Sequence, residues 1–302
     1  MHWLLSTPDA FSLRSAIQRS GWLLYPPFHI HTLGTQLHRV EHLSTNAAIG
    51  LTLYQAPAGL VLNTETQLSG QEIEEASAKV WRMLRMEENC EPFLRLARHT
   101  EYLDATRRVG ARLIRGATLF EDVLTATMAT RTDRDTLSWE LVAGLVDRLG
   151  DPLPSNPTLH TFPTPERVLH DTDLLEDLLA RPVIERVEQL ARIFHQQTDE
   201  MEALVQRPWS ADDLALSLTR VFSLEAESLG LLMLSLGRYD YIPNDTLAQR
   251  RMGKVQDSDA ETDPDAVRRF FERWQPWGGL AYWLWDWSRI SASTGVKLHP
   301  QR

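Results

Sequence analysis

The chain has 302 residues, 43% of them hydrophobic, and its 41 acidic and 31 basic side chains give a net charge of -10. Its single cysteine, Cys90, excludes a disulfide framework and a four-cysteine zinc or iron–sulfur site within the chain. No apolar run approaches the roughly 20 residues of a membrane span, and the first residues lack the basic and apolar regions of a signal peptide. We therefore expect a soluble, cytoplasmic protein with no membrane partner. The acidic balance taken alone weighs against nucleic-acid binding.

The first third of the chain mixes strand and helix signals. Alternating apolar and polar residues predict three strands, at 35–43, 48–55 and 59–62. Apolar residues at helical spacing after Ser69 predict a helix that ends near residue 86. Antiparallel strands packed with one long helix form a compact α+β domain, which we place at residues 1–105.

Beyond about residue 102, helical periodicity replaces the strand signals. The longer predicted helices lie at 118–130, 135–149, 182–205, 263–274 and 279–290. Ser210 and Ser223 are expected to cap two more helices, the second of which runs to Leu236. The fold class predicted is therefore mainly α, with an N-terminal α+β domain followed by an all-helical body at residues 106–302.

The segment at 236–246 is the most informative part of the sequence. A near-continuous apolar run ends at Gly237, a typical helix terminator. A short turn containing Pro243 then brings one carboxylate, Asp245, to the start of a polar helix. Asp is a common N-cap, so the local pattern is satisfied by a capping residue as well as by an acid at the mouth of a cleft.

The C-terminal part is rich in tryptophan, with five of the ten tryptophans at 274–287. Most of these are expected to pack in the core. Trp274 and Trp277 precede the last helix in a Pro/Gly turn, so they are the candidates for a stacking wall around a flat ligand, with packing as the alternative.

Four segments in order resemble the DNA glycosylases of the helix-hairpin-helix superfamily, in the branch of alkyladenine glycosylase II and 8-oxoguanine glycosylase. They are Gly110-Ala111-Arg112-Leu113-Ile114-Arg115 with the following Leu119-Phe120-Glu121-Asp122-Val123, then Phe162-Pro163-Thr164-Pro165-Glu166, then residues 237–245, and last Arg273-Trp274-Gln275-Pro276-Trp277 with Gly279-Leu280-Ala281. The segment containing Ser20-Gly21-Trp22 and Pro26-Pro27-Phe28 is similar to the α+β domain that precedes the helical core in this branch. The resemblance spans almost the whole chain and implies a DNA cleft between the two domains.

The resemblance implies an enzyme that flips a damaged base out of the duplex and breaks its N-glycosidic bond. Asp245 matches the aspartate that stabilises the oxocarbenium-like transition state in this family. The base pocket would include Trp277, Trp274 and Tyr239.

Two departures from the family pattern concern the hairpin. Ala226 occupies the register of the lysine that forms a Schiff base in bifunctional members, which implies a monofunctional enzyme. The family's Gly-hydrophobic-Gly turn, which holds a DNA phosphate and often a monovalent cation, reads Phe222-Ser223-Leu224-Glu225 here. The lost glycines weigh against the usual clamp and its cation, although Ser223 keeps the possibility of a capped helix end that contacts DNA.

The third departure is the wedge that fills the gap left by the flipped base. In the corresponding loop, Arg131 is the candidate wedge and Arg134 a candidate phosphate contact. An ordinary solvated loop explains the same residues equally well.

We therefore expect a monomeric DNA repair glycosylase, cytoplasmic and nucleoid-associated, that acts on double-stranded DNA carrying a damaged base, most plausibly an alkylated purine. The alternatives are a catalytically inactive protein of this fold that binds lesions or structured DNA, and an interaction domain without DNA affinity. No cofactor and no metal are expected, since His29 and His31 share one strand face but lack a third ligand nearby.

Overall fold

The computed structural model describes residues 1–9, 11–19, 25–31, 35–45, 48–104, 106, 110–131, 137–256 and 265–286. The chain forms two compact units, each made of two stretches of sequence. The sheet unit consists of Met1–Asn89 with Arg112–Arg207, and the aspartate unit of Cys90–Ala111 with Pro208–Arg302. The two units are groups of residues in mutual contact, and they do not test the domain boundary expected between residues 105 and 106. That boundary stays a prediction.

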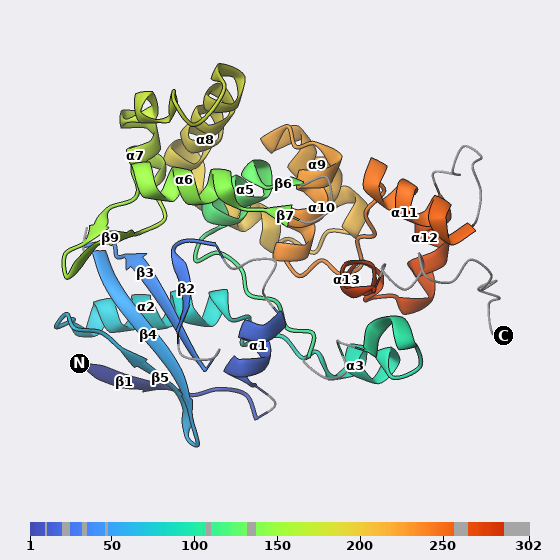
Figure 1. The fold of residues 1–302 in the computed structure, drawn as a ribbon, viewed down its shortest axis with the longest axis horizontal. Coiled ribbons are helices and arrows are strands. Elements are labelled where there is room, and N and C mark those ends of the chain that lie inside the picture. The colour runs from blue at the N-terminus through green and yellow to red at the C-terminus, as the bar shows by residue number, and fades with distance from the viewer. Residues whose placement is uncertain are drawn as a thin grey trace. The chain divides into compact units, whose positions relative to one another are not determined.

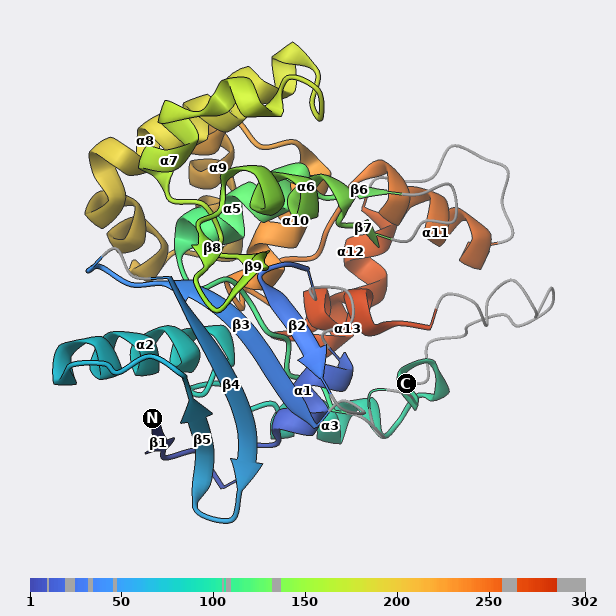
Figure 2. The same cartoon turned by 60° about the vertical axis from the view of Figure 1, so that its left-hand side comes forward.

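A five-stranded antiparallel sheet is the centre of the sheet unit (Figures 1 and 2). Its order is β1-β5-β4-β3-β2. The strands are β1 (His2–Leu5), β2 (Phe28–His31), β3 (Gln36–His42), β4 (Ala48–Ala56) and β5 (Gly59–Asn63). The three predicted strands are confirmed, and β2 is the extended segment in which His29 and His31 were expected to share a strand face. Strand β1 is too short to show an alternating pattern and was not predicted.

The two faces of the sheet differ in chemistry. One face is apolar and fully buried: Leu37 pairs with Leu53, which pairs with Leu62, and each is at most 1% exposed. Helix α2 (Gly70–Met83) belongs to this unit and begins after Ser69, as predicted. Ser69 and Glu72 form a capping box, in which they exchange side-chain and backbone hydrogen bonds. The other face carries polar side chains at the alternating positions.

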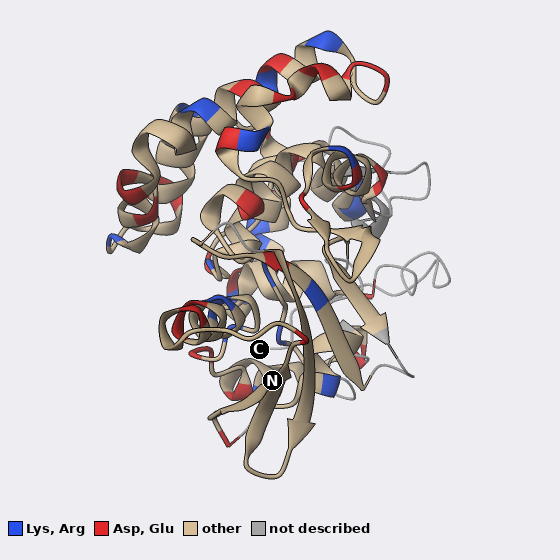
Figure 3. Ribbon diagram, turned by 90° about the vertical axis from the view of Figure 1, so that its left-hand side faces the viewer, with Lys and Arg blue, Asp and Glu red and all other residues tan. Residues whose placement is uncertain are grey.

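Five further α-helices, one 3-10 helix and two short strand pairs complete the described part of the sheet unit. One of these helices, α5, is almost entirely buried. The other elements are α1 (Leu13–Arg19), α5 (Leu119–Met128), β6 (Thr130–Arg131), β7 (Leu137–Ser138), α6 (Glu140–Leu149), β8 (Pro152–Leu153), β9 (Asn156–His160), α7 (Pro165–His170), η3 (Thr172–Leu175) and α8 (Arg181–Gln206). Figure 3 shows basic and acidic residues interleaved along α8, which fits a solvated helix face.

The regular elements among the described residues of the aspartate unit are all helices. Its elements are α3 (Glu91–Ala97), η2 (Glu101–Leu103), α9 (Ala211–Phe222), α10 (Ala226–Ser235), α11 (Thr246–Gln256), α12 (Ala266–Phe271), η4 (Glu272–Trp274) and α13 (Gly278–Leu284). An aromatic core holds them together. Trp285 stacks on Tyr102 at a centroid distance of 4.8 Å and meets Phe271 and Trp274 edge-on at 5.3 and 5.2 Å.

The predicted fold class is confirmed, with two corrections of detail. The body beyond residue 106 was expected to be all-helical, but the pairs β6–β7 and β8–β9 form small hairpins. The helix expected from residue 135 begins at Glu140, because Leu137 and Ser138 pair with β6 instead. Among the described residues, no helix has the length and apolar character needed to cross a membrane.

A buried ionic cluster ties the sheet to α5. The guanidinium of Arg39 on β3 is 1% exposed and bonds both carboxylate oxygens of Glu121, at 3.0 and 2.7 Å. Its Nε donates to Glu41 at 2.6 Å. Beside it, Asp122 accepts from Arg115 and from the backbone of Gly116. The first turn of α5 is thus fastened to the sheet through charges that water does not screen.

Replacing Arg39 by methionine should destabilise the protein by about 3–5 kcal/mol, because Glu41 and Glu121 would keep their burial and lose their cation. The exposed pair between Arg148 and Asp177, joined at 2.6 Å, supplies the control: Arg148→Met should cost about 0–1 kcal/mol. Urea denaturation followed by circular dichroism measures both. Equal losses in the two variants would contradict a structural role for the buried cluster.

Candidate active site around Asp245

The turn that leads to Asp245 starts at a well-formed helix end. Gly237 adopts a left-handed backbone with φ of 74°. The amide of Arg238 donates to the carbonyl of Met233 at 2.9 Å, and that of Gly237 to Leu234 at 3.1 Å. This is the paired bonding of a Schellman motif, which favours glycine at the left-handed position. The predicted termination of the helix at Gly237 is therefore confirmed.

Of the two acids in the turn, Asp240 is neutralised by a neighbour. Arg238 donates to both of its carboxylate oxygens, at 3.0 and 2.7 Å, and also to the carbonyl of Trp209. A forked guanidinium–carboxylate pair of this kind fixes the acid and compensates its charge. Asp240 is therefore a structural acid.

Asp245 has a different environment. It is 3% exposed and directly precedes α11, where its Oδ1 accepts the amide of Ala248 at 2.7 Å. Its Oδ2 is buried and has no hydrogen-bond partner among the described residues. The side chain thus caps the helix with one oxygen, as the local pattern predicted. The second oxygen is held in a low-dielectric site where an unpaired polar atom is costly, and unexplained orphans of this kind point to a function.

The charge of Asp245 reaches the phenol of Tyr241. Burial, followed by the nearby charges of Asp245 and Asp212, raises the pKa of Tyr241 to about 12. The phenol therefore stays protonated throughout the physiological range, as a neutral neighbour of the acid.

Glycines on two helices hold this turn in place. At the start of α13, the amide of Gly279 donates to the carbonyl of Tyr239 at 2.7 Å, and a Cβ at Gly279 would lie 2.0 Å from the carbonyl oxygen of Tyr241. On α10, a Cβ at Gly230 would lie 3.5 Å from the ring of Pro243. The backbone before Asp245 is therefore in close contact with α13 and packs against α10.

The three aromatic residues predicted for a base pocket occupy different environments. Tyr239 is buried and stacks on Trp277, with 5.5 Å between ring centroids. Trp277 is half-buried and also meets Phe93 at 5.9 Å. Trp274 is 7% exposed and packs in the aromatic core, which favours its alternative as a packing residue. Trp277 keeps a surface that a ligand can reach, and the pocket itself stays a prediction.

The hairpin between α9 and α10 retains a left-handed turn without glycine. Ser223 is exposed, has φ of 45° and ψ of 44°, and ends α9. The expectation that it caps α10 was wrong, because Glu225 occupies that N-cap position and makes no side-chain cap bond. Ala226, which the sequence resemblance places at the register of the Schiff-base lysine, is the first residue of α10. The helix start thus carries the carboxylates of Glu225 and Glu227, which suit the helix dipole but repel phosphate.

Two predicted DNA contacts remain, Arg131 and Arg134. Arg131 is the second residue of β6 and pairs with Leu137. Arg134 lies outside the described residues. Among the side chains that the structure describes, no group of three or more His, Cys, Asp or Glu residues is arranged to hold a metal ion.

The fold is that of the helix-hairpin-helix DNA glycosylases. A 3-methyladenine DNA glycosylase from Archaeoglobus fulgidus superposes with a TM-score of 0.69 at 19% identity, covering 97% of this chain and 100% of that one. MBOgg1, solved with a low-affinity DNA ligand, gives 0.67 at 13% identity over 97% and 96% of the two chains. The 8-oxoguanine glycosylase/lyase of Clostridium acetobutylicum gives 0.66 at 12% identity over 92% of each chain.

No family model and no curated protein matches the sequence. The shared architecture is therefore established from structure, at identities too low for sequence to transfer an activity or a site residue.

Gly279→Ala should displace the turn before Asp245 and destabilise the protein by about 1–3 kcal/mol, because the new methyl overlaps a backbone oxygen that cannot move alone. Gly70→Ala is the matched control: a Cβ there meets nothing within 4 Å, and alanine in the first turn of α2 should be neutral or slightly stabilising. Urea denaturation monitored by tryptophan fluorescence compares them. A neutral Gly279→Ala would show that the contact is not a constraint.

Proposed function

We propose that this protein is a DNA repair glycosylase that flips a damaged base out of double-stranded DNA and hydrolyses its N-glycosidic bond. The observation that carries the proposal is Asp245: a buried carboxylate, at the start of a helix, with one oxygen used as a cap and the other unpaired. Its position in a glycosylase fold supports the same conclusion.

The proposed reaction requires few protein groups besides Asp245. As the bond between the base nitrogen and C1′ breaks, the electron pair leaves with the base and C1′ becomes oxocarbenium-like. The ionised carboxylate stabilises that charge and orients water. Water then gives its hydroxyl to C1′ and releases its proton to the solvent. A carboxylate that is already held in place stabilises the developing positive charge more strongly in a buried, low-dielectric site than in water.

An alkylated purine is the substrate class that suits a single acid. N-alkylation leaves a positive charge on the purine, so the base departs without a separate proton donor. The half-buried face of Trp277 supplies a surface on which a flipped, electron-poor ring can stack. One structural relative is named as a 3-methyladenine glycosylase, while others act on 8-oxoguanine.

The proposed enzyme is monofunctional. Ala226 stands at the lysine register, and the chain has only three lysines, Lys79, Lys254 and Lys297. Of these, Lys79 bonds Glu41 in the sheet unit. Hydrolysis by water therefore replaces attack by an amine.

DNA is proposed to be held by Arg131 and Arg134, with the exposed turn at Ser223 as a backbone contact. A monomer acting on nucleoid DNA in the cytoplasm fits this arrangement. Arginine binds phosphate in forked geometry, which compensates in part for the scarcity of lysine.

Asp245→Asn should slow base release by about a hundredfold or more, because it removes the charge that offsets the developing cation while keeping the cap geometry. Asp177→Asn, on an exposed side chain, is the matched control and should retain full activity. Release is measured in single-turnover assays on duplexes with 3-methyladenine, 7-methylguanine or 8-oxoguanine. Equal rates for Asp245→Asn and wild type would remove Asp245 from the mechanism.

Borohydride should trap no covalent adduct between wild-type protein and any duplex that it cleaves, since a trapped imine needs a lysine or terminal amine at C1′. A bifunctional glycosylase assayed in parallel provides the positive control. A borohydride-dependent adduct on denaturing gels would show that a lyase step exists.

The second candidate is a protein of the same fold that binds lesions or structured DNA without cleaving. The observation in its favour is the hairpin, where the turn lacks glycine and the following helix starts with Glu225 and Glu227. It predicts retention of lesion duplexes in gel shifts at low salt, with no base release from any of them.

A further inference from the structure

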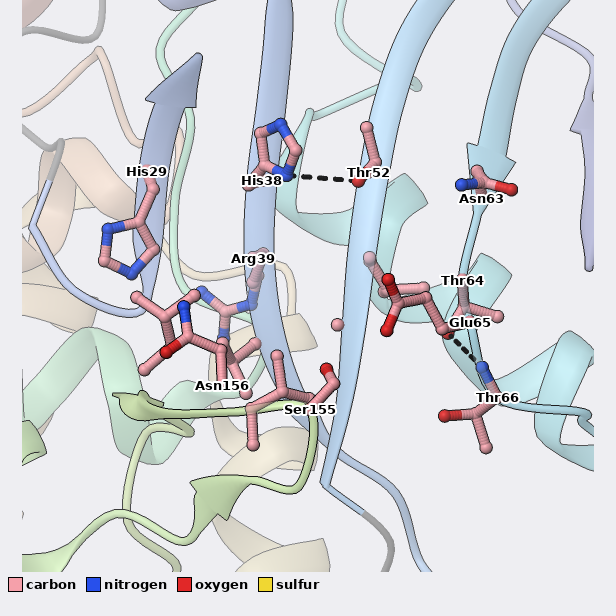
Figure 4. Close-up of a pocket in the computed structure, with 15 residues that line it drawn as sticks. His29, His38, Arg39, Thr52, Asn63, Thr64, Glu65, Thr66, Ser155 and Asn156 are labelled. Atoms are coloured by element: carbon pink, nitrogen blue, oxygen red, sulfur yellow. Dashed lines mark hydrogen bonds between the residues drawn. The ribbon is translucent and has the colours of Figure 1, made fainter.

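The outer face of the sheet carries a row of polar side chains in register across neighbouring strands. His29 of β2 is paired with His38 of β3, His38 with Thr52 of β4, and Thr52 with Asn63 of β5. Directly paired residues point to the same face, so the four side chains form a continuous line. Figure 4 shows them on successive strands.

The two imidazoles are held in defined positions. Nδ1 of His38 lies 3.1 Å from the hydroxyl of Thr52. Nε2 of His29 is buried and has no hydrogen-bond partner among the described residues. Burial, and then the neighbouring His38, lower the pKa of His29. A neutral imidazole offers one donor and one acceptor. In His29, Nε2 is the atom that could bind a ligand.

The β8–β9 hairpin turns this face into a cavity. Leu153 lies so close to β4 that a Cβ at Gly50 would be 3.1 Å from its side chain, which anchors the hairpin on the sheet. A cavity of about 300 Å³ opens beside this contact, between the polar row and the hairpin residues Ser155 and Asn156 (Figure 4). All of its lining residues belong to the sheet unit.

The charge of the lining limits what it can accept. Arg39 contributes to the wall, but its guanidinium is committed to Glu41 and Glu121 on the buried side of the sheet. Glu65 adds a negative charge at the far end. The described lining residues thus provide no uncommitted cation for a phosphate, and the pocket disfavours anions.

We propose that this cavity binds an uncharged, planar nitrogen heterocycle of nucleobase size, as a free base or a nucleoside and not as a nucleotide. Its volume is at the lower end of small-molecule sites. The sheet and the hairpin both line the cavity, with half-buried Leu159 and the mostly covered Val40 among its apolar lining residues. This site lies outside the aspartate unit, so it is additional to the proposed excision chemistry.

Recognition would come from the edges of the ring. The amide of Asn63 presents a donor and an acceptor, the combination that reads the edge of adenine in DNA. Asn156 adds the donors of its amide nitrogen, since its Oδ1 already accepts from the backbone and the hydroxyl of Thr158. His29 and Thr52 supply further hydrogen bonds along the row. A ligand edge with alternating donors and acceptors satisfies groups that would otherwise depend on water.

The test is calorimetric titration of the full chain with adenine, guanine, adenosine and adenosine 5′-monophosphate, supported by saturation-transfer NMR. We expect a base or nucleoside to bind at least tenfold more tightly than the monophosphate. Thr52→Val, which removes the hydroxyl at nearly constant shape, and Asn63→Leu should each weaken that binding about tenfold, the loss of one or two hydrogen bonds.

Two controls locate the site. Thr45→Val, on an exposed side chain that bonds Glu72 outside the cavity, should leave binding unchanged. Asp245→Asn should also leave it unchanged, which separates this cavity from the candidate active site. Three results would each overturn the proposal: no binding of any of the four compounds at millimolar concentration, equal affinity for the monophosphate, or binding that Thr52→Val and Asn63→Leu do not alter. Circular dichroism verifies that both variants are folded.

Discussion

The close contact between the start of α13 and the turn before Asp245 is the constraint on which the candidate site depends. It is possible only because residue 279 has no side chain: its amide bonds Tyr239, and its Cα sits where any Cβ would overlap the carbonyl of Tyr241. Two backbones at this distance exclude water and leave the turn little freedom. Since Pro243 packs at the same time near Gly230 of α10, the path of the chain is set from both sides before it reaches the acid.

That rigidity explains how one carboxylate can cap a helix with one oxygen and keep the other oxygen buried and unpaired. A cap at the start of α11 needs only Oδ1, and the bond from Ala248 fixes the plane of the group. The orientation of Oδ2 follows without a further contact, and its burial keeps the local dielectric low. The arrangement costs stability, because an unpaired buried oxygen is unfavourable. Asp240, only five residues earlier, shows the alternative outcome: Arg238 donates to both of its carboxylate oxygens, so neither is left unpaired.

Local signals made part of this predictable from sequence. Gly237 and Asp245 could be placed because a Schellman end and an N-cap are decided by a few neighbouring residues, and the capped helix after Ser69 for the same reason. The sequence could not predict that Trp274 packs in the core while Trp277 stays half-buried, since three residues in a turn decide which ring enters the core. Nor could the row from His29 to Asn63, because strand register depends on pairings that are distant in sequence. The strand β7 was hidden by helical periodicity that continues into α6.

The hairpin between α9 and α10 combines a strained backbone with an acidic helix start. Ser223 holds a left-handed conformation that costs roughly 1–2 kcal/mol outside glycine, so the packing of α9 against α10 must offset it. The turn therefore has a left-handed geometry, but the helix dipole that would attract a phosphate is met by Glu225 and Glu227. Under the proposed function, the protein would draw its affinity for DNA from arginines elsewhere. Its binding should then depend on salt through those side chains more than through the backbone amides of the turn.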